Sequence, residues 1–128
     1  MILKPDEESC TEFLNSIQNY SDRTDLPHNR NQFVTKTVGR DIALSIQCYL
    51  KSDFAKCAEL LEPLYNNNQI VLIGGSNAQR DVFNLLYLNA LIHSKKKSPN
   101  EVKELINQRK IRKLKSDLNE RLLKKLEN

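Results

Sequence analysis

An all-α fold is predicted by three features of the sequence. The chain of 128 residues contains only three glycines and four prolines, which leaves few of the tight turns that an antiparallel β-protein needs. It has no tryptophan and few other aromatic residues, whereas the cores of many β-sandwiches are anchored by aromatic side chains. Apolar residues instead recur every three or four positions, which is the spacing of amphipathic helices. We therefore expect about six helices in a single domain over residues 1–128.

The first part of the chain is expected to hold one helix and a loop. Acidic residues near the start favour the positive end of a helix dipole, and Pro5 suits the first helical position. We expect this helix over residues 6–20 and a loop over the polar residues 21–31. The apolar stripe of the helix has the spacing i, i+3, i+4, i+7 and consists of Cys10, Phe13, Leu14 and Ile17.

Residues 32–66 are expected to form a helical hairpin. Ser52 and Asp53 interrupt the apolar pattern and supply an N-cap for the second helix. A connection this short requires the two helices to pack antiparallel. Gly39 lies inside the first helix at a cost of about 1 kcal/mol relative to alanine, and we expect it to permit close approach of a neighbouring helix. The stripe of the second helix consists of Phe54, Cys57, Ala58, Leu60, Leu61 and Leu64.

A second hairpin is expected over residues 76–110. Ser76 and Gln79 have the S-x-x-Q spacing of a capping box and predict the start of its first helix. Because this helix is apolar around much of its circumference, we expect it to be the most buried one. Ser98 and Glu101 have the corresponding spacing at the start of its partner helix, with a proline between them at the first helical position.

A terminal helix is expected over residues 116–127. Its apolar residues Leu118, Leu122 and Leu126 have the spacing i, i+4, i+8. Residues 109–115, which connect it to the second hairpin, fit either a helix or a linker.

The stretch IVLIGGSNAQRD, residues 70–81, has the outline of a strand, a phosphate loop and a helix. Its glycines, Gly74 and Gly75, are adjacent and no third follows, whereas the dinucleotide fingerprint needs three spaced glycines. It also lacks the lysine of a P-loop, and no second strand is expected to pair with its apolar run. We interpret it as the joint between two helices. The N–H groups of residues 76–78 are an alternative, generic site for an anion.

A resemblance to tetratricopeptide repeats appears within the predicted hairpins. Packing positions of that repeat are matched by Leu44, Ser45, Asp53, Phe54, Cys57, Ala58 and Leu61, with a cysteine where a small alanine is usual. The stretch IGGSNAQRDVFNLL, residues 73–86, is similar to a signature of the tetratricopeptide repeat protein 38 family, with Gly74, Gly75, Ser76 and Gln79 as its structural residues. In that family a hairpin like residues 39–64 precedes the signature and a segment like residues 109–128 follows it.

The resemblance covers roughly residue 34 to the end and corresponds to the C-terminal quarter of the longer family members. It implies antiparallel, α-solenoid-like hairpins of tetratricopeptide type and a protein-interaction role, without established catalytic residues. Arg40 and Asp41 depart from the pattern, because a more apolar pair is expected after the glycine. This departure implies that a surface buried in the longer proteins is solvated here.

Arg80, Asp81 and Arg40 are the candidate partner-binding residues. Arg80 and Asp81 fall on the first turn of the helix expected to be most buried, where charge is costly unless it is paired. We expect Asp81 to act as an N-terminal capping group and Arg80 to bind carbonyls at the end of the preceding helix. The alternative is that Arg80 contacts a partner.

Basic residues are concentrated in the last quarter of the chain. From Lys95 to the end there are twelve Lys and Arg against five Asp and Glu, whereas the rest of the chain is slightly acidic. We interpret this segment as a solvated helix face; the alternative is contact with RNA or an acidic surface. No aromatic residue follows Tyr87, so a nucleic-acid contact would be nonspecific. The candidate residues are Lys95, Lys96, Lys97, Arg109, Lys110, Arg112 and Lys113.

Metal binding and catalysis are not indicated by the sequence. His28 and His93 are far apart and lack the spacing of zinc motifs, so no metal site and no cofactor are expected. A nucleophilic cysteine would have to be Cys48 or Cys57 with His93 as its base, but all three have packing interpretations. We expect no enzymatic activity. An odd number of scattered cysteines, with no signal peptide or membrane span, predicts a cytoplasmic protein.

A protein-interaction scaffold is therefore the function that the sequence predicts, with a protein partner that the sequence does not identify. The alternative is a basic adaptor that contacts RNA or acidic lipid through the C-terminal segment. An apolar face left exposed at the end of the helical array would favour self-association.

Overall fold

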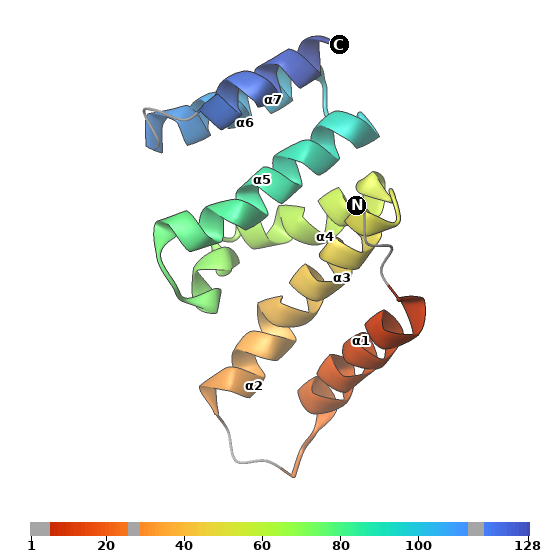
Figure 1. Cartoon of the computed structure of the whole chain (residues 1–128). Coiled ribbons are helices and arrows are strands. Elements are labelled where there is room, and N and C mark those ends of the chain that lie inside the picture. Colours follow the sequence, from red (N-terminus) through yellow and green to blue (C-terminus); the bar gives the residue numbers. More distant parts are fainter. Residues whose placement is uncertain (1–5, 26–28, 113–116) are drawn as a thin grey trace.

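The computed structural model describes residues 6–25, 29–112 and 117–128, which form helices joined by short connections and contain no strand (Figure 1). Helices α2 and α3 are joined by a π-helical turn, η1, and form one continuous helix, so the described residues hold six long helices and a short 3-10 helix, η2. This confirms the all-α prediction. The elements are α1 (Glu7–Asp22), α2 (Arg30–Val34), η1 (Thr35–Gly39), α3 (Arg40–Leu50), α4 (Phe54–Asn66), η2 (Gln69–Ile73), α5 (Asn77–Ser94), α6 (Pro99–Arg112) and α7 (Asp117–Glu127).

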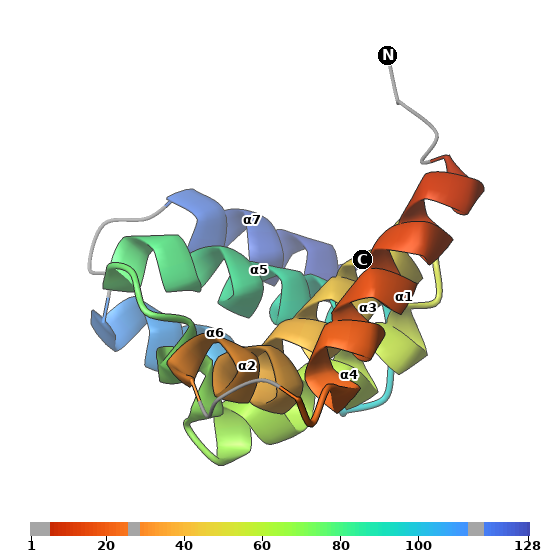
Figure 2. The same ribbon diagram turned by 90° about the horizontal axis from the view of Figure 1, so that it is seen from below.

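The helices are arranged in two layers (Figure 2). In the first layer α1 contacts α3, α3 contacts α5, and α5 contacts α7. In the second layer α4 packs against both α3 and α5, while α6 packs against both α5 and α7. The first layer therefore forms a row of four helices, and α4 and α6 cover one side of it.

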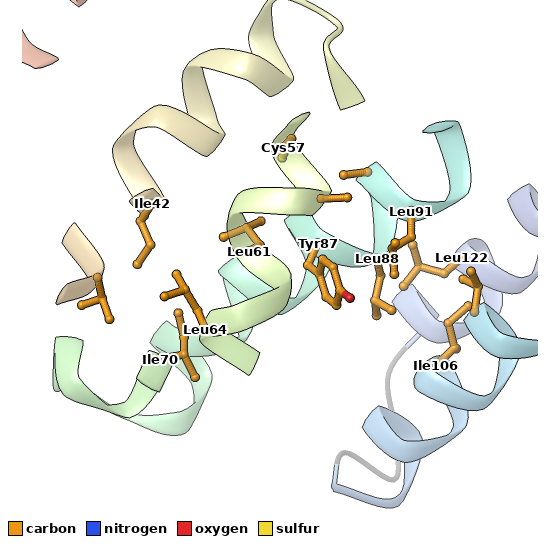
Figure 3. Packing of buried hydrophobic residues seen from close by; sticks show 14 residues of the cluster. Ile42, Cys57, Leu61, Leu64, Ile70, Tyr87, Leu88, Leu91, Ile106 and Leu122 are labelled. Atoms are coloured by element: carbon orange, nitrogen blue, oxygen red, sulfur yellow. The ribbon is translucent and has the colours of Figure 1, made fainter. Parts of the chain in front are cut away.

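The core lies where α4 and α5 meet (Figure 3). Leu61 of α4 is 0% exposed and Leu88 of α5 is 1% exposed. The expectation that α5 is the most buried helix is too strong, because α4 contributes as many buried residues and Val82 of α5 is 61% exposed. Helix α4 is enclosed because it packs between two helices of the first layer.

Most of the capping residues predicted from the sequence lie at the starts of helices in the structure. Asp53 accepts a hydrogen bond from the Lys56 backbone N–H, and Ser76 and Gln79 form the complete capping box at the start of α5. Ser98 Oγ accepts from the Glu101 N–H at 3.3 Å. At α1 the cap is Asp6, so the helix begins at Glu7 rather than at a proline; Pro5 lies outside the described residues.

Three packing predictions are corrected by the structure. A side chain at Gly39 would contact only atoms of its own helix, so this glycine does not admit a neighbouring helix. Leu118 is 42% exposed, because α7 is rotated to bury Asn119 beside Leu122. Phe13 is 59% exposed although it belongs to the stripe of α1, because that stripe lines an open groove.

The run Ile70–Ile73 is a link between helices, as interpreted from the sequence, and forms most of the 3-10 helix η2. Gly74 and Gly75 end it with φ of +79° and +72°. Gly74 combines its φ with a ψ of −156°, a backbone conformation that is accessible essentially only to glycine. The glycine pair therefore turns the chain from η2 into α5.

Replacing Gly74 with alanine is expected to lower the free energy of unfolding by about 1–3 kcal/mol, because the new side chain strains the backbone. Gly39→Ala is the matched control. Its Cβ would lie 3.7 Å from the nearest atom, and alanine favours a helix, so we expect stabilisation by about 0.5–1 kcal/mol. Urea denaturation followed by circular dichroism measures both changes. Equal effects of the two substitutions would contradict the assigned conformation of Gly74.

Candidate functional site

Arg80 is held by the backbone of the glycine turn. Its Nη1 donates to the carbonyl oxygens of Gly74 at 3.0 Å and Gly75 at 2.5 Å, and its Nη2 donates to Asn77 Oδ1 at 2.5 Å. The guanidinium therefore binds carbonyls that precede α5, as expected from the sequence. The same contacts fix the side chain at the joint between η2 and α5.

Asp81 and Arg109 form a buried ion pair. Arg109 Nε lies 3.0 Å from Asp81 Oδ1, and Arg109 Nη2 lies 2.6 Å from Asp81 Oδ2. The exposed fractions of the two side chains are 12% for Asp81 and 3% for Arg109. Arg109 also donates to Asn119 Oδ1, so the pair links α5, α6 and α7. Such a planar, bidentate arrangement combines charge with fixed geometry.

Two predictions are wrong at this pair. Asp81 does not cap the N-terminus of α5, because the capping box occupies that position and the Asp81 carboxylate is turned towards α6. Arg109 does not belong to a solvated basic face. It follows Val102 and Ile106 on the inner face of α6, where their i, i+4, i+7 spacing was a signal that could have revealed it.

A two-part cleft lies over this ion pair, between α4 and α6. One lobe has a volume of about 610 Å³ and the other about 600 Å³, and both are lined by Tyr65, Asn84 and Arg109. The first lobe extends along α6, and the second extends towards η2 and the start of α5, where Arg80 and Asp81 line it. The lobes thus meet at residues contributed by α4, α5 and α6.

Two tyrosines line the cleft: Tyr65 lines both lobes and Tyr87 lines the first. The rings of Tyr65 and Tyr87 are stacked, with centroids 5.3 Å apart. Burial raises the pKa of Tyr87 to about 12, and burial together with the negative charge of Asp81 raises the pKa of Tyr65 further. The Tyr65 hydroxyl is buried and has no hydrogen-bond partner among the described residues. Neither the two tyrosines nor Asn84 could be identified from the sequence, because only the packing of three helices brings them together.

The basic candidates are dispersed over the described surface. Lys95 ends α5 and is exposed, whereas Lys96 binds Glu59 and Lys97 lies 2.7 Å from Glu62, both on α4. The loop between α5 and α6 is therefore partly neutralised by α4. The side chains of Lys110 and Arg112, and all of Lys113, lie outside the described residues.

Arg40 connects the first two long helices. Its Nη1 donates to Gln18 Oε1 of α1 at 3.1 Å, and its Nε lies 3.6 Å from Asp41 Oδ1. Both charged side chains keep contact with solvent, at 41% and 31% exposed. Arg40 therefore makes contacts within the chain, between α1 and α3.

An apolar groove of about 310 Å³ runs between α1 and α3. Three of its lining side chains are large and exposed: Phe13 at 59%, Leu50 at 54% and Ile46 at 39%. All its lining residues except Gln47 are apolar, cysteine or glycine: Cys10, Phe13, Leu14, Ile17, Gly39, Ile42, Ala43, Ile46, Leu50 and Phe83. Exposed apolar surface of this kind is typical of interaction sites.

The cysteine and histidine candidates do not line the cleft over the ion pair. Burial raises the pKa of the fully buried Cys57 thiol to about 11, which disfavours its nucleophilic thiolate form. The His93 ring packs on Phe54, and its Nδ1 lies 2.8 Å from the Asn89 carbonyl oxygen. His28 lies outside the described residues.

The described part of the chain contains no group of three or more His, Cys, Asp or Glu residues placed to hold a metal ion. None of its helices has both the length and the apolar character needed to cross a membrane.

No protein-family model matches the chain, and no solved structure matches it.

Proposed function

We propose that this chain is a cytoplasmic protein-interaction module, without catalytic activity of its own, that binds an amphipathic helix of another protein in the groove between α1 and α3. The observation that carries the proposal is the exposure of Phe13, Ile46 and Leu50 along one nearly continuous apolar lining. A helix that inserts apolar side chains at i, i+3, i+4 and i+7 is a recurrent ligand of such grooves.

Charge on α1, beside the apolar lining of the groove, indicates which helix fits. Helix α1 contains four acidic residues, including Glu7, Glu8 and Glu12 at its first turns, and no Lys or Arg. A partner helix with basic residues beside its apolar stripe would complement the acidic residues of α1. A second copy that approached through its own α1 would instead bring two acidic helices together, so self-association is the weaker alternative.

The packing order supports tetratricopeptide-type hairpins. In such repeats the second helix of each hairpin packs against the first helix of the next. Here α4 follows α3 and packs on α5, and α6 follows α5 and packs on α7. Helices α3 and α5 then correspond to the first helices of two hairpins. The row of α1, α3, α5 and α7 would form the binding face, and the groove between α1 and α3 lies in this row.

Free thiols support the proposed cytoplasmic location. Cys10, Cys48 and Cys57 form no disulfide, which suits a reducing compartment.

The alternative function, a basic adaptor for RNA or acidic lipid, receives less support. It relied on a continuous basic segment, but Arg109 is buried and two lysines of the α5–α6 loop contact acids on α4. A steep loss of heparin retention with increasing salt would favour this alternative.

The groove is tested by Ile46→Asp. The probe is a synthetic amphipathic helix with leucines at helical spacing and lysines elsewhere, and binding is measured by fluorescence anisotropy. Because burying an isoleucine is worth about 1.5–3 kcal/mol, we expect at least a tenfold loss of affinity. Leu118→Asp on α7, at a site of similar exposure, is the matched control and is expected to leave binding unchanged.

A second probe separates charge from apolar character. The same peptide with glutamates in place of its lysines should bind the groove more weakly, because of the acidic residues on α1, and the difference should shrink in high salt. The proposal would be contradicted if the basic peptide did not bind the unmodified chain. It would also be contradicted if Ile46→Asp and Leu118→Asp lost the same amount of affinity for the peptide.

A further inference from the structure

We infer that the partner helix lies in the groove between α1 and α3 in one direction, parallel to α1 and with its N-terminus beside Glu7, because the two ends of the groove differ in charge. The inference rests on the proposed function, since it takes this groove as the binding site. It adds the direction of the ligand, which the apolar lining does not determine. Apolar residues at i, i+3, i+4 and i+7 keep the same spacing when a helix is reversed.

The groove has two distinct ends because α1 and α3 are antiparallel (Figure 1). At one end the start of α1 meets the end of α3, where Lys51 Nζ lies 3.5 Å from Glu7 Oε1. At the other end the later part of α1 meets the start of α3, where Arg40 Nη1 donates to Gln18 Oε1 at 3.1 Å. These two contacts establish which charges lie at which end.

The end beside Glu7 is the more negative one. Asp6 lies four residues before Cys10 and Glu7 lies three before it, so both continue the face of α1 that lines the groove. Lys51 offsets one of these two charges. The helix ends add little, because the positive end of the α1 dipole lies beside the negative end of the α3 dipole. The N-terminus of a bound helix, which is positive, is therefore favoured here.

The end beside Arg40 is the more positive one. Lys36 is exposed and lies three residues before Gly39, so it continues the lining face of α3 beyond the groove. Arg40 adds a second positive charge and reaches across to α1. The nearby acidic residues Asp22 and Asp41 are not three, four or seven residues from any lining residue of their own helices, so they lie off this face. The C-terminus of a bound helix, which is negative, is therefore favoured here.

Both ends of the groove therefore favour the same direction. A charge beside a helix terminus changes an affinity by about two- to fivefold at low ionic strength. The two ends together should then favour the direction parallel to α1 by about fourfold or more. Because the charges are exposed to solvent, the preference should decline as salt is added.

The direction is measured at low salt with the leucine–lysine peptide that tests the groove, blocked at both termini and carrying a nitroxide label at one end. The label broadens the backbone amide signals of nearby residues in the NMR spectrum of the full chain. We expect a label at the N-terminus of the peptide to broaden the signals of Glu7 and Leu50, and a label at its C-terminus to broaden those of Lys36 and Arg40. The opposite pattern, or broadening of both ends by each label, would overturn the direction but not the proposed function. Failure of the unlabelled peptide to bind would overturn both.

Glu7→Lys combined with Lys36→Glu tests whether the charges at the two ends set the direction. The pair keeps the net charge of the chain but reverses one charge at each end, so the labelled peptides should no longer give the pattern of the unmodified chain. The control combines Glu12→Lys with Lys103→Glu, two exposed positions off the lining faces of the groove, and should keep that pattern. An unchanged pattern in the first variant, or the same change in the control, would overturn the inference. Circular dichroism establishes that both variants are folded.

Discussion

Replacing Asp81 with alanine is expected to lower the free energy of unfolding by about 3–5 kcal/mol, the range for removal of one partner of a buried ion pair. The side chain of Arg109 is 3% exposed, and its guanidinium would lose the hydrogen bonds that it donates to the Asp81 carboxylate. Because Arg109 also binds Asn119, the substitution should loosen the attachment of α6 and α7 to α5. Urea denaturation followed by circular dichroism measures the change.

Asp41→Ala is the matched control for Asp81→Ala. Asp41 lies 3.6 Å from Arg40, but both side chains keep much of their solvent contact, and such pairs contribute about 0–1 kcal/mol. We expect a correspondingly small change in the free energy of unfolding. Substitution of both buried partners by apolar residues, Asp81→Leu with Arg109→Met, should be less destabilising than Asp81→Ala alone. Similar losses in Asp41→Ala and Asp81→Ala would contradict the burial of the pair.

Much of the fold could be predicted because its signals are local. A cap such as Asp53 or Ser76 acts on backbone N–H groups two or three residues away, so its effect is independent of the rest of the molecule. The glycine joint is also local, because the conformation of Gly74 excludes other residues on steric grounds alone. These signals located the helices to within a few residues.

The assignment of Arg109 to a solvated basic face failed for a different reason. Counting charges over a segment averages over the faces of a helix, whereas burial depends on the face on which each residue lies. Arg109 lies on the face of Val102 and Ile106, so its position indicated burial although its charge indicated solvent. Asn119 was overlooked in the same way beside the apolar stripe of α7.

The cleft could not be predicted, since its residues are brought together only by packing. Tyr65 is near the end of α4, Asn84 is in the middle of α5, and Arg109 is on α6. Each has an ordinary place on its own helix. Their convergence depends on the positions of α4 and α6 on either side of α5, which no periodicity in the sequence specifies.

Leu61→Ala is expected to lower the free energy of unfolding by about 2–5 kcal/mol. Leu61 of α4 is 0% exposed and belongs to the core cluster, so its truncation loses apolar burial and leaves a cavity. The matched control is Leu118→Ala on α7. It makes the same change within a helix, but its side chain is 42% exposed, so we expect a change of about 0.5 kcal/mol or less. Because both substitutions alter helix propensity equally, the difference between their urea-denaturation midpoints isolates packing. A difference near zero would contradict the enclosure of α4 between α3 and α5, on which the cleft and its tyrosine pair depend.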